Sequence, residues 1–413
     1  MKKIAKIFFA AMAVFAVAAC NKDDGQEIGL TDYEKAIQTL TKNYVENVIY
    51  ATYGNLASAG NDLYEDLLAI KEAGVDKISQ SDIDKACTDF LRARAYWEAS
   101  EAFLYGAATD FSIDPHIDSW PLDRQRLANN LSNSKVVADL DEEGADAIDE
   151  VGASALGFHG IEFILFRDGA ARTVADLKAE ETADEFKGTG VNGAQEIIFA
   201  TAVAEDLRNS LFQLNVSWNP NAPAAQKEVV EDLELNCTVN GTERTYGENM
   251  LGAAEAGSTY ATWQEVAQTI LVGGCANIAN EVFSSKMGQA YSGDDESYIE
   301  SPYSKKSFVD FRDNILSIQY SLYGSAGAAS PAANSLMSFL ESNHASEASA
   351  VKTTLAAALK SLETCINTGV AFVDNCTADS GKYHTIQSQV GDAIDAISDL
   401  NDALEEAAAA IKD

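Results

Sequence analysis

Apolar residues recur at the spacing of an α-helix through most of this 413-residue chain, which contains only 6 prolines. Near the start, for example, Tyr33, Ile37, Leu40 and Tyr44 lie three or four residues apart. Residues at that spacing share one face of a helix, whereas the alternation typical of strands is scarce. Because proline interrupts helices, so few prolines permit long ones. The sequence therefore predicts an all-α fold.

The length of the chain bears on its domain organisation. A chain of 413 residues exceeds what one ordinary hydrophobic core supports. By composition, the best linker candidate is the proline- and asparagine-rich segment at residues 219–223. We therefore expect two helical-bundle domains, residues 32–218 and residues 219–413.

The first 31 residues are predicted to export and tether the protein. Basic residues precede an apolar stretch at 7–16, and the sequence Val-Ala-Ala-Cys ending at Cys20 resembles a bacterial lipobox. Residues 1–19 are then a signal peptide, Cys20 is lipidated, and residues 20–31 form a tether. The Lys-Asp-Asp run at 22–24 resembles an export signal for the outer face of the outer membrane, with the periplasmic face as the alternative. No other stretch is apolar for long enough to span a bilayer, so the lipid alone would hold the protein to the membrane.

Charge and cysteine content exclude several classes of protein. The formal net charge is −35, which repels nucleic acid and attracts cations. The cysteines other than Cys20 form no C-x-x-C pattern, which argues against a zinc ribbon or a redox motif. In an oxidising compartment, disulfides could join Cys365 to Cys376 or Cys237 to Cys275, and the sequence favours neither.

One stretch, residues 155–166, is apolar almost throughout but contains His159 and Glu162. A helix that is hydrophobic all round lies inside a protein, so both ionisable side chains are predicted to be buried. At i and i+3 they share one face, and a buried carboxylate must be paired, neutralised or bound to a metal. Gly157 and Gly160 lower helix propensity, which a close approach of another backbone or of a ligand would explain. The pair is either a structural contact or part of a functional site.

The same stretch carries a family resemblance. The residues Gly157–Glu162 match the pattern G-x-H-x-x-E of the imelysin-like proteins, which are also classed as the M75 peptidase family. Three further stretches, in the same order along the chain, resemble that family: Trp97–Gly106, Ile117–Asp123 and Ser301–Ile315. Together these motifs span most of the chain. The resemblance implies two helical-bundle domains of related architecture.

The resemblance also implies a function. Members of this family are linked to bacterial iron uptake as periplasmic or surface proteins, and some were named as peptidases. We therefore expect the protein to bind iron or a small iron-bearing ligand, with an outer-membrane transport protein as a potential partner. The alternative is a metallopeptidase of the M75 type with its metal, iron or zinc, on His159 and Glu162.

The predicted metal ligands begin with the H-x-x-E pair. His159 and Glu162 supply one nitrogen and one oxygen, and a catalytic zinc takes three protein ligands. Glu98 and Glu101 are the expected further donors if their helix neighbours that of His159, and the resemblance places Glu101 in a shared motif. A site rich in carboxylates with one histidine suits hard ferric iron better than zinc. No second histidine motif is present, which argues against a ferritin-like di-iron site.

Other residues are predicted at the edge of this site, and no catalytic residue is assigned. Arg94 is the nearby cation, and it could equally pair with Glu98 at i+4. Gly157, Trp120 and Ser304 are the other candidate site residues, each within one of the family-like stretches. His116, in a proline-containing loop, is expected to be exposed and not a ligand.

Overall fold

The computed structural model describes residues 29–412 and confirms the all-α prediction. Its strands, β1 (Phe166–Arg167) and β2 (Ala170–Ala171), form a single antiparallel hairpin in which Phe166 pairs with Ala171. The predicted signal peptide and the lipidation of Cys20 lie outside the described residues. Within residues 29–412, no helix combines the length and the apolar content that crossing a membrane requires.

Helices account for most of the chain. The α-helices of the first half are α1 (Asp32–Tyr44), α2 (Tyr50–Ala73), α3 (Gln80–Glu98), α4 (Ala107–Asp110), α5 (Ile113–Ile117), α6 (Arg124–Ser132), α7 (Ser134–Glu143), α8 (Gly157–Leu165), α9 (Val174–Lys178) and α10 (Gly193–Trp218). Those of the second half are α11 (Ala224–Asp232), α12 (Tyr246–Leu251), α13 (Trp263–Gln268), α14 (Asn277–Glu281), α15 (Gly288–Ser292), α16 (Ser307–Tyr323), α17 (Leu336–Asn343), α18 (Ala345–Asn367), α19 (Phe372–Cys376) and α20 (Gln387–Ala410).

Shorter helical turns connect these elements. The 3₁₀ turns are η2 (Glu101–Phe103), η3 (Gly144–Glu150), η4 (Ala153–Ala155), η5 (Asp184–Phe186) and η8 (Ala378–Ser380). The π-helical segments are η1 (Val45–Ile49), η6 (Thr269–Ala276) and η7 (Val282–Lys286). Several helices begin with a capping box, in which the cap side chain and the residue three positions later bond each other's backbone; Thr31 with Glu34 and Asn192 with Gln195 are examples.

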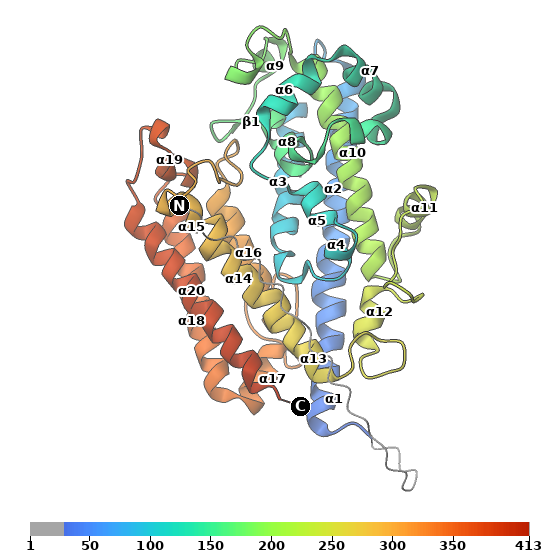
Figure 1. The fold of residues 1–413 in the computed structure, drawn as a ribbon, viewed down its shortest axis with the longest axis vertical. Helices are drawn as coiled ribbons and strands as arrows, with labels where there is room; N and C mark the ends of the chain where they lie inside the picture. Colours follow the sequence, from blue (N-terminus) through green and yellow to red (C-terminus); the bar gives the residue numbers. More distant parts are fainter. Residues whose placement is uncertain (1–28, 413) are drawn as a thin grey trace, which may run out of the picture.

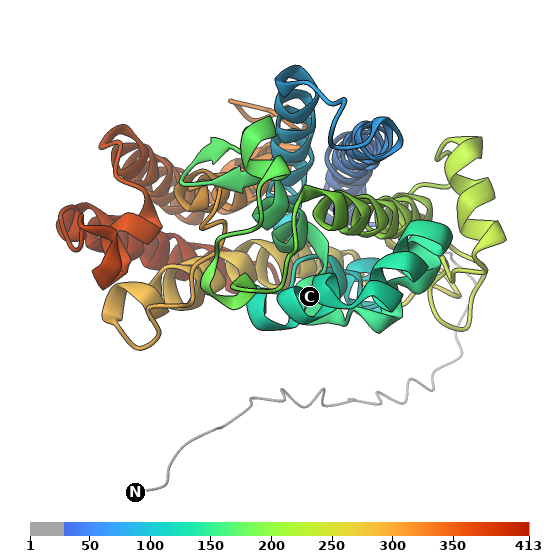
Figure 2. The ribbon, with the colours of Figure 1, turned by 90° about the horizontal axis from the view of Figure 1, so that it is seen from above.

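The long helices form two groups that pack against each other (Figure 1). Helix α2 lies along both α3 and α10, and α18 lies along α20 and α16. Helix α16 also contacts α3, which joins the groups, and α1 packs on α13 and α17. Seen from above, α18 and α20 occupy one end of the molecule and α11 the other (Figure 2).

The predicted linker, residues 219–223, forms the loop between α10 and α11. Helices α11 and α12, which follow this loop, pack back against α10. One contiguous hydrophobic core runs through helices of both halves. The division into domains at residues 219–223 therefore remains a prediction.

Helix α8 carries the G-x-H-x-x-E motif, and all nine of its residues are buried. It begins at Gly157, whose φ of +65° lies in the left-handed region that favours glycine. A Cβ on Gly157 would stand 1.9 Å from the carbonyl oxygen of Ile117. The predicted close approach of another backbone at this glycine is confirmed, and it brings the end of α5 against the start of α8.

The five cysteines in the described residues are free thiols. Cys87, Cys275, Cys365 and Cys376 are buried, and Cys237 is half-buried. Neither of the disulfides considered from the sequence is formed.

Candidate functional site

Ionisable side chains from both halves of the chain meet in what we call the charged cluster. They come from α3, from η2, from the residue after α5, from α8, from η7, from the loop before α16 and from α16 itself. All are less than 9% exposed. The cluster comprises Arg94, Glu98, Glu101, Asp118, His159, Glu162, Lys286, Glu300 and Asp310.

His159 lies between two carboxylates of the cluster. Its Nε2 is 3.1 Å from Oδ1 of Asp118, and its Nδ1 is 3.7 Å from Oε2 of Glu162. The Asp118 contact has the length of an ion pair, although Nε2 lacks the angles of a regular hydrogen bond. Burial disfavours the charged imidazole, but Asp118 and Glu162 outweigh burial and raise the pKa of His159 to about 9.

Glu162 is fixed by the loop that precedes α16. Its Oε1 accepts hydrogen bonds from the backbone N–H and the hydroxyl of Ser304, both at 2.7 Å, and from the N–H of Tyr303 at 3.1 Å. The other oxygen, Oε2, faces His159. The G-x-H-x-x-E helix is thereby tied to the Ser301–Ile315 stretch, and the predicted site residue Ser304 makes the contact.

Arg94 is the first cation of the cluster. Its guanidinium pairs with Asp118, Glu98 and Glu300. The indole N–H of Trp97 holds the other oxygen of Asp118 at 2.7 Å. Arg94 therefore does pair with Glu98, as the i+4 spacing indicated, and it also joins three carboxylates from separate parts of the chain.

Lys286, the last residue of η7, is the second cation. Its Nζ is 3.2 Å from Glu101, 3.3 Å from Glu300 and 3.9 Å from Glu98. Burial opposes the charged ammonium, but the neighbouring carboxylates outweigh burial and raise the pKa of Lys286. Short π-helical segments often occur at functional sites, and this one carries a fully buried lysine into the cluster.

Negative charge exceeds positive charge in the cluster, which holds six carboxyl groups against two permanently charged bases and one histidine. Burial raises the pKa of Glu98 and of Glu101 well above the ordinary value. Asp118 differs, because Arg94 and His159 overcome the effect of burial and lower its pKa. Buried carboxylates in excess must be compensated by protons or by an added cation.

Two sets of three residues have donor atoms close enough to hold one metal ion. The first set is Asp118, His159 and Glu300, and the second is Glu98, Glu101 and Asp118. Within each set the donor atoms lie within 4.8 Å of one another. The first set offers one nitrogen and two carboxylates, the second carboxylates alone, and Asp118 belongs to both.

Two cavities reach the cluster. One of 390 Å³ is lined by His159, Trp120, Arg124 and Tyr303 among others. The second, of 280 Å³, is strongly acidic, and its lining residues include Glu101, Asp114, Asp118, Glu281 and Lys286. Trp120, a predicted site residue, lines both cavities. Burial raises the pKa of Asp114, in the acidic cavity, to about 6.

The structure brings the predicted residues together but changes their grouping. Glu98 and Glu101 share a candidate set with Asp118 rather than with His159. Asp118, Lys286, Glu300 and Asp310 were not predicted as site residues. Two signals were available, because Asp118 belongs to the family-like stretch Ile117–Asp123 and Glu300 directly precedes the stretch at Ser301. Lys286 and Asp310 had no comparable signal.

The prediction for His116 was wrong on exposure. Its side chain is 33% exposed, and its Nε2 is 2.8 Å from Oδ2 of Asp206 on α10. A carboxylate one helix away shields the imidazole, and no spacing in the sequence indicates that pairing.

The family model described as Imelysin, Peptidase_M75, matches residues 49–408. Iron-regulated protein A of Synechococcus elongatus is 24% identical over 303 residues, which cover 73% of this chain and 68% of that protein.

Two solved structures share the fold. The crystal structure of a candidate iron-regulated protein A precursor from Parabacteroides distasonis superposes with a TM-score of 0.72 at 20% identity, covering 93% of this chain and 97% of that one. An imelysin-like protein from Psychrobacter arcticum gives a TM-score of 0.57 at 12% identity, with 90% and 93% covered.

Proposed function

Because this chain belongs to the imelysin family, we propose that it binds iron at the charged cluster as part of bacterial iron acquisition. The ion is cargo, held by Asp118, His159 and Glu300, and Glu98 and Glu101 form an adjoining acidic set. The name of the Synechococcus relative, an iron-regulated protein, is consistent with an iron-related role.

The observation that carries this proposal is the excess of negative charge in the cluster. Four carboxylate oxygens of the cluster are buried without a hydrogen-bond partner among the described residues: Oε1 of Glu98, Oε2 of Glu162, Oε2 of Glu300 and Oδ2 of Asp310. Such atoms are costly unless a cation or a proton satisfies them. A set of carboxylates with one imidazole matches a hard iron ion.

Lys286 gives the proposal a specific feature. Its ammonium contacts Glu101 and Glu300, whose oxygens belong to the two candidate sets. An incoming cation competes with this ammonium for the same carboxylates. Replacing Lys286 with methionine should therefore tighten metal binding while destabilising the metal-free protein, because the carboxylates lose their counter-charge.

The test is a titration of the purified protein with Fe(III) nitrilotriacetate, with Fe(II) under anaerobic conditions and with Zn(II). We expect Fe(III) to bind most tightly, and Asp118→Asn to weaken it by at least about 100-fold, since losing a ligand exceeds the usual effect of an outer-shell change. Asp206→Asn is the matched control, because Asp206 also pairs with a histidine but lies outside the cluster.

Melting curves recorded alongside distinguish binding from packing. His159→Ala should abolish metal binding in a protein that still folds, at a lower melting temperature because Asp118 and Glu162 lose a counter-charge. If the wild-type protein binds none of the three ions, and His159→Ala lowers the melting temperature sharply, the cluster is a structural ion network and the proposal fails.

A metallopeptidase is the second candidate function. One observation favours it: His159 lines a cavity of 390 Å³, large enough for a peptide side chain. In that case the metal would polarise a peptide carbonyl, and another carboxylate of the cluster would act as general base. Peptide hydrolysis that requires metal and is lost in His159→Ala would favour this function over storage or transfer of the ion.

We further propose that Cys20 is lipidated and that the protein is attached to the outer membrane, facing the cell exterior. The lipobox-like sequence ending at Cys20 supports this location. Cys20→Ser should release the protein into the soluble fraction, and protease treatment of intact cells should degrade the wild-type protein. Protection from protease would favour the periplasmic face. A surface position would suit transfer of iron to an outer-membrane transport partner.

A further inference from the structure

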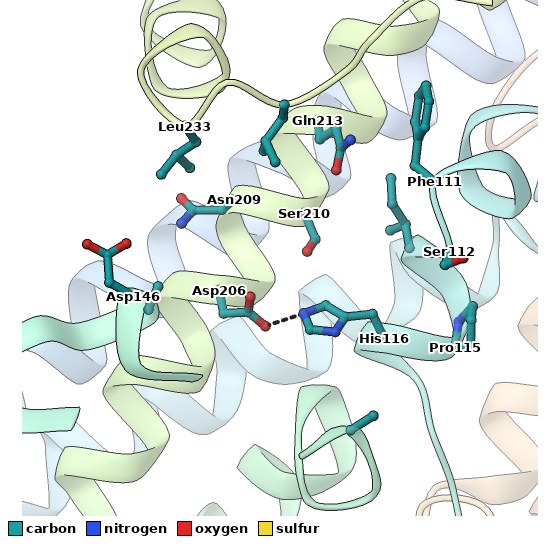
Figure 3. Close-up of a pocket in the computed structure, with 14 residues that line it drawn as sticks. Phe111, Ser112, Pro115, His116, Asp146, Asp206, Asn209, Ser210, Gln213 and Leu233 are labelled. Carbon is teal, nitrogen blue, oxygen red and sulfur yellow. Dashed lines mark hydrogen bonds and ion pairs between the residues drawn. The ribbon is translucent and has the colours of Figure 1, made fainter. Parts of the chain in front are cut away.

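A third cavity, of 560 Å³, lies between α5, α10 and the segment that follows α11 (Figure 3). Helix α5 contributes Ile113, Pro115 and His116 to its wall. Pro115 also lines the acidic cavity of the charged cluster, so the two cavities meet at this short helix. The proposed metal site uses none of the groups that give this cavity its chemistry.

One wall of the cavity is a polar face of α10. Asp206, Asn209, Ser210 and Gln213 follow one another at helical spacing, and all four line the cavity. Ser210 is only 8% exposed and directs its hydroxyl into the cavity (Figure 3). The amide nitrogen of Gln213 donates to the backbone oxygen of Asn236 at 2.9 Å, which leaves the Gln213 oxygen as an acceptor. Hydrogen-bonding groups are thus presented to a ligand.

Apolar side chains also line the cavity, namely Phe111, Ile113, Leu233 and Leu235. Leu233 is 39% exposed, which is unusual for a large hydrophobic side chain in the described residues of this protein. Sites for small molecules typically combine an apolar lining with a few polar groups at fixed positions. The volume of such a site is typically about 300–1,000 Å³.

The charges around the cavity indicate which sign of charge a ligand should carry. Asp206 is paired with His116 at 2.8 Å, so this pair adds no positive charge to the cavity when the imidazole is protonated. Asp146, an exposed residue, stands on the rim with its carboxylate unpaired by any described base. The chain as a whole carries a formal net charge of −35. These charges favour a cation over an anion.

We propose that this cavity binds a small organic cation with an apolar body, of the class of the arylalkylamines. The ammonium group lies toward Asp146 and the polar face of α10. The apolar body packs on Phe111 and Leu233. This binding is separate from iron binding and would persist when all metal is removed.

Calorimetric titration of the purified protein in the presence of a chelator tests the proposal. The probes are tryptamine and indole-3-propionate, which share an indole ring but carry opposite charges. We expect tryptamine to bind and indole-3-propionate to bind at least about ten-fold more weakly, because the carboxylate replaces the attraction of an exposed ion pair with a repulsion. Equal affinities for the two probes, or no binding of tryptamine, would overturn the proposal.

Two pairs of variants locate the binding. Leu233→Ser should weaken the binding of tryptamine about five-fold, because it removes apolar contact. Val272 is another exposed apolar residue, at 47%, and Val272→Ser should have no effect. Asp146→Asn should weaken the binding of tryptamine about three-fold. Asp32 lies on the exposed first turn of α1, and Asp32→Asn should leave the binding unchanged. Both target side chains are exposed, so neither substitution endangers the fold. If targets and controls behave alike, tryptamine binds elsewhere and the assignment of this cavity is wrong.

Discussion

Two buried networks of charged residues flank helix α8, and they differ in charge balance and in access. The charged cluster, which contains His159, holds carboxylates in excess. The second, which we call the balanced network, pairs two arginines with two glutamates: Arg167, Arg172, Glu181 and Glu196. Both networks are largely shielded from solvent, and only Arg167 is substantially exposed, at 29% of its side chain.

The balanced network contains equal numbers of arginines and glutamates, although Oε2 of Glu196 is buried without a hydrogen-bond partner among the described residues. Glu181 accepts from Arg167 at 2.7 Å and from Arg172 at 3.1 Å, and Arg172 also reaches Glu196 at 2.8 Å. Arg172 donates to the carbonyl oxygen of Ile164 at the end of α8. The network thereby joins the β1–β2 hairpin to α8 and α10, and its role is structural.

The comparison shows that burial of charge alone does not indicate function. Both networks contain buried carboxylates and perturbed pKa values. Only the charged cluster combines an excess of negative charge with cavities that reach it, at His159 on one side and Glu101 on the other. Charge balance and access therefore separate a candidate binding site from a structural ion network.

The largest expected effect comes from removing an arginine of each network. Arg94→Met leaves three carboxylates without their shared partner, and we expect it to lower the free energy of unfolding by about 5 kcal/mol. Arg172→Met leaves two carboxylates without their partner, and we expect it to lower the free energy of unfolding by about 3 kcal/mol. Urea denaturation of both variants measures the difference. Equal losses would show that the cluster is no more dependent on its cation than the balanced network is.

The next effect concerns pH and the balanced network. Burial, only partly offset by Arg172, raises the pKa of Glu196 from 4.5 to about 7. A carboxyl group with a raised pKa favours the folded state when protonated, so its contribution is present below pH 4.5 and lost as the pH rises through 7. Between pH 5 and 8 the loss is about 2.5 kcal/mol.

Glu196→Gln should remove this loss, because the amide cannot ionise. Urea denaturation at several pH values, with the exposed Glu228→Gln as the control, measures the difference in slope. If Glu196→Gln and Glu228→Gln show the same pH dependence, Glu196 is ionised throughout and the balanced network is fully charged at every pH tested.

The smallest effect is stabilisation by metal. At a free Fe(III) concentration ten times its Kd, binding should add about 1.4 kcal/mol to the free energy of unfolding. We expect this gain in the wild-type protein and in Glu196→Gln, and its absence in Asp118→Asn. A gain that survives Asp118→Asn but disappears in Glu196→Gln would reverse the roles assigned to the two networks.

Much of the fold could be predicted from the sequence, because helical spacing and capping residues act over a few positions. The apolar stretch around His159 and Glu162 correctly indicated a buried helix. The pairing of His159 with Asp118 could not be predicted, since it depends on α5 meeting α8 at Gly157. Lys286 was also beyond prediction, because a lone lysine in a helical pattern is usually solvated.

The site was predicted in part for a similar reason. Of the predicted site residues, five lie in the charged cluster: Arg94, Glu98, Glu101, His159 and Glu162. The sequence could not indicate that Glu98 and Glu101 group with Asp118 and not with His159. Such grouping depends on the relative position of helices from distant parts of the chain, which local sequence patterns do not indicate.

Helix α5, only five residues long, separates the 560 Å³ cavity from the acidic one, and Pro115 faces both. Asp118 caps its C-terminus, while His116 lies on the other side. A ligand that displaces this partition from one side would also displace Asp118. Thermodynamic reciprocity then requires any change that an amine causes in the affinity for iron to equal the change that iron causes in the affinity for the amine. Because only α5 separates the two cavities, binding in one is expected to change the affinity of the other. A shift of α5 would carry that effect.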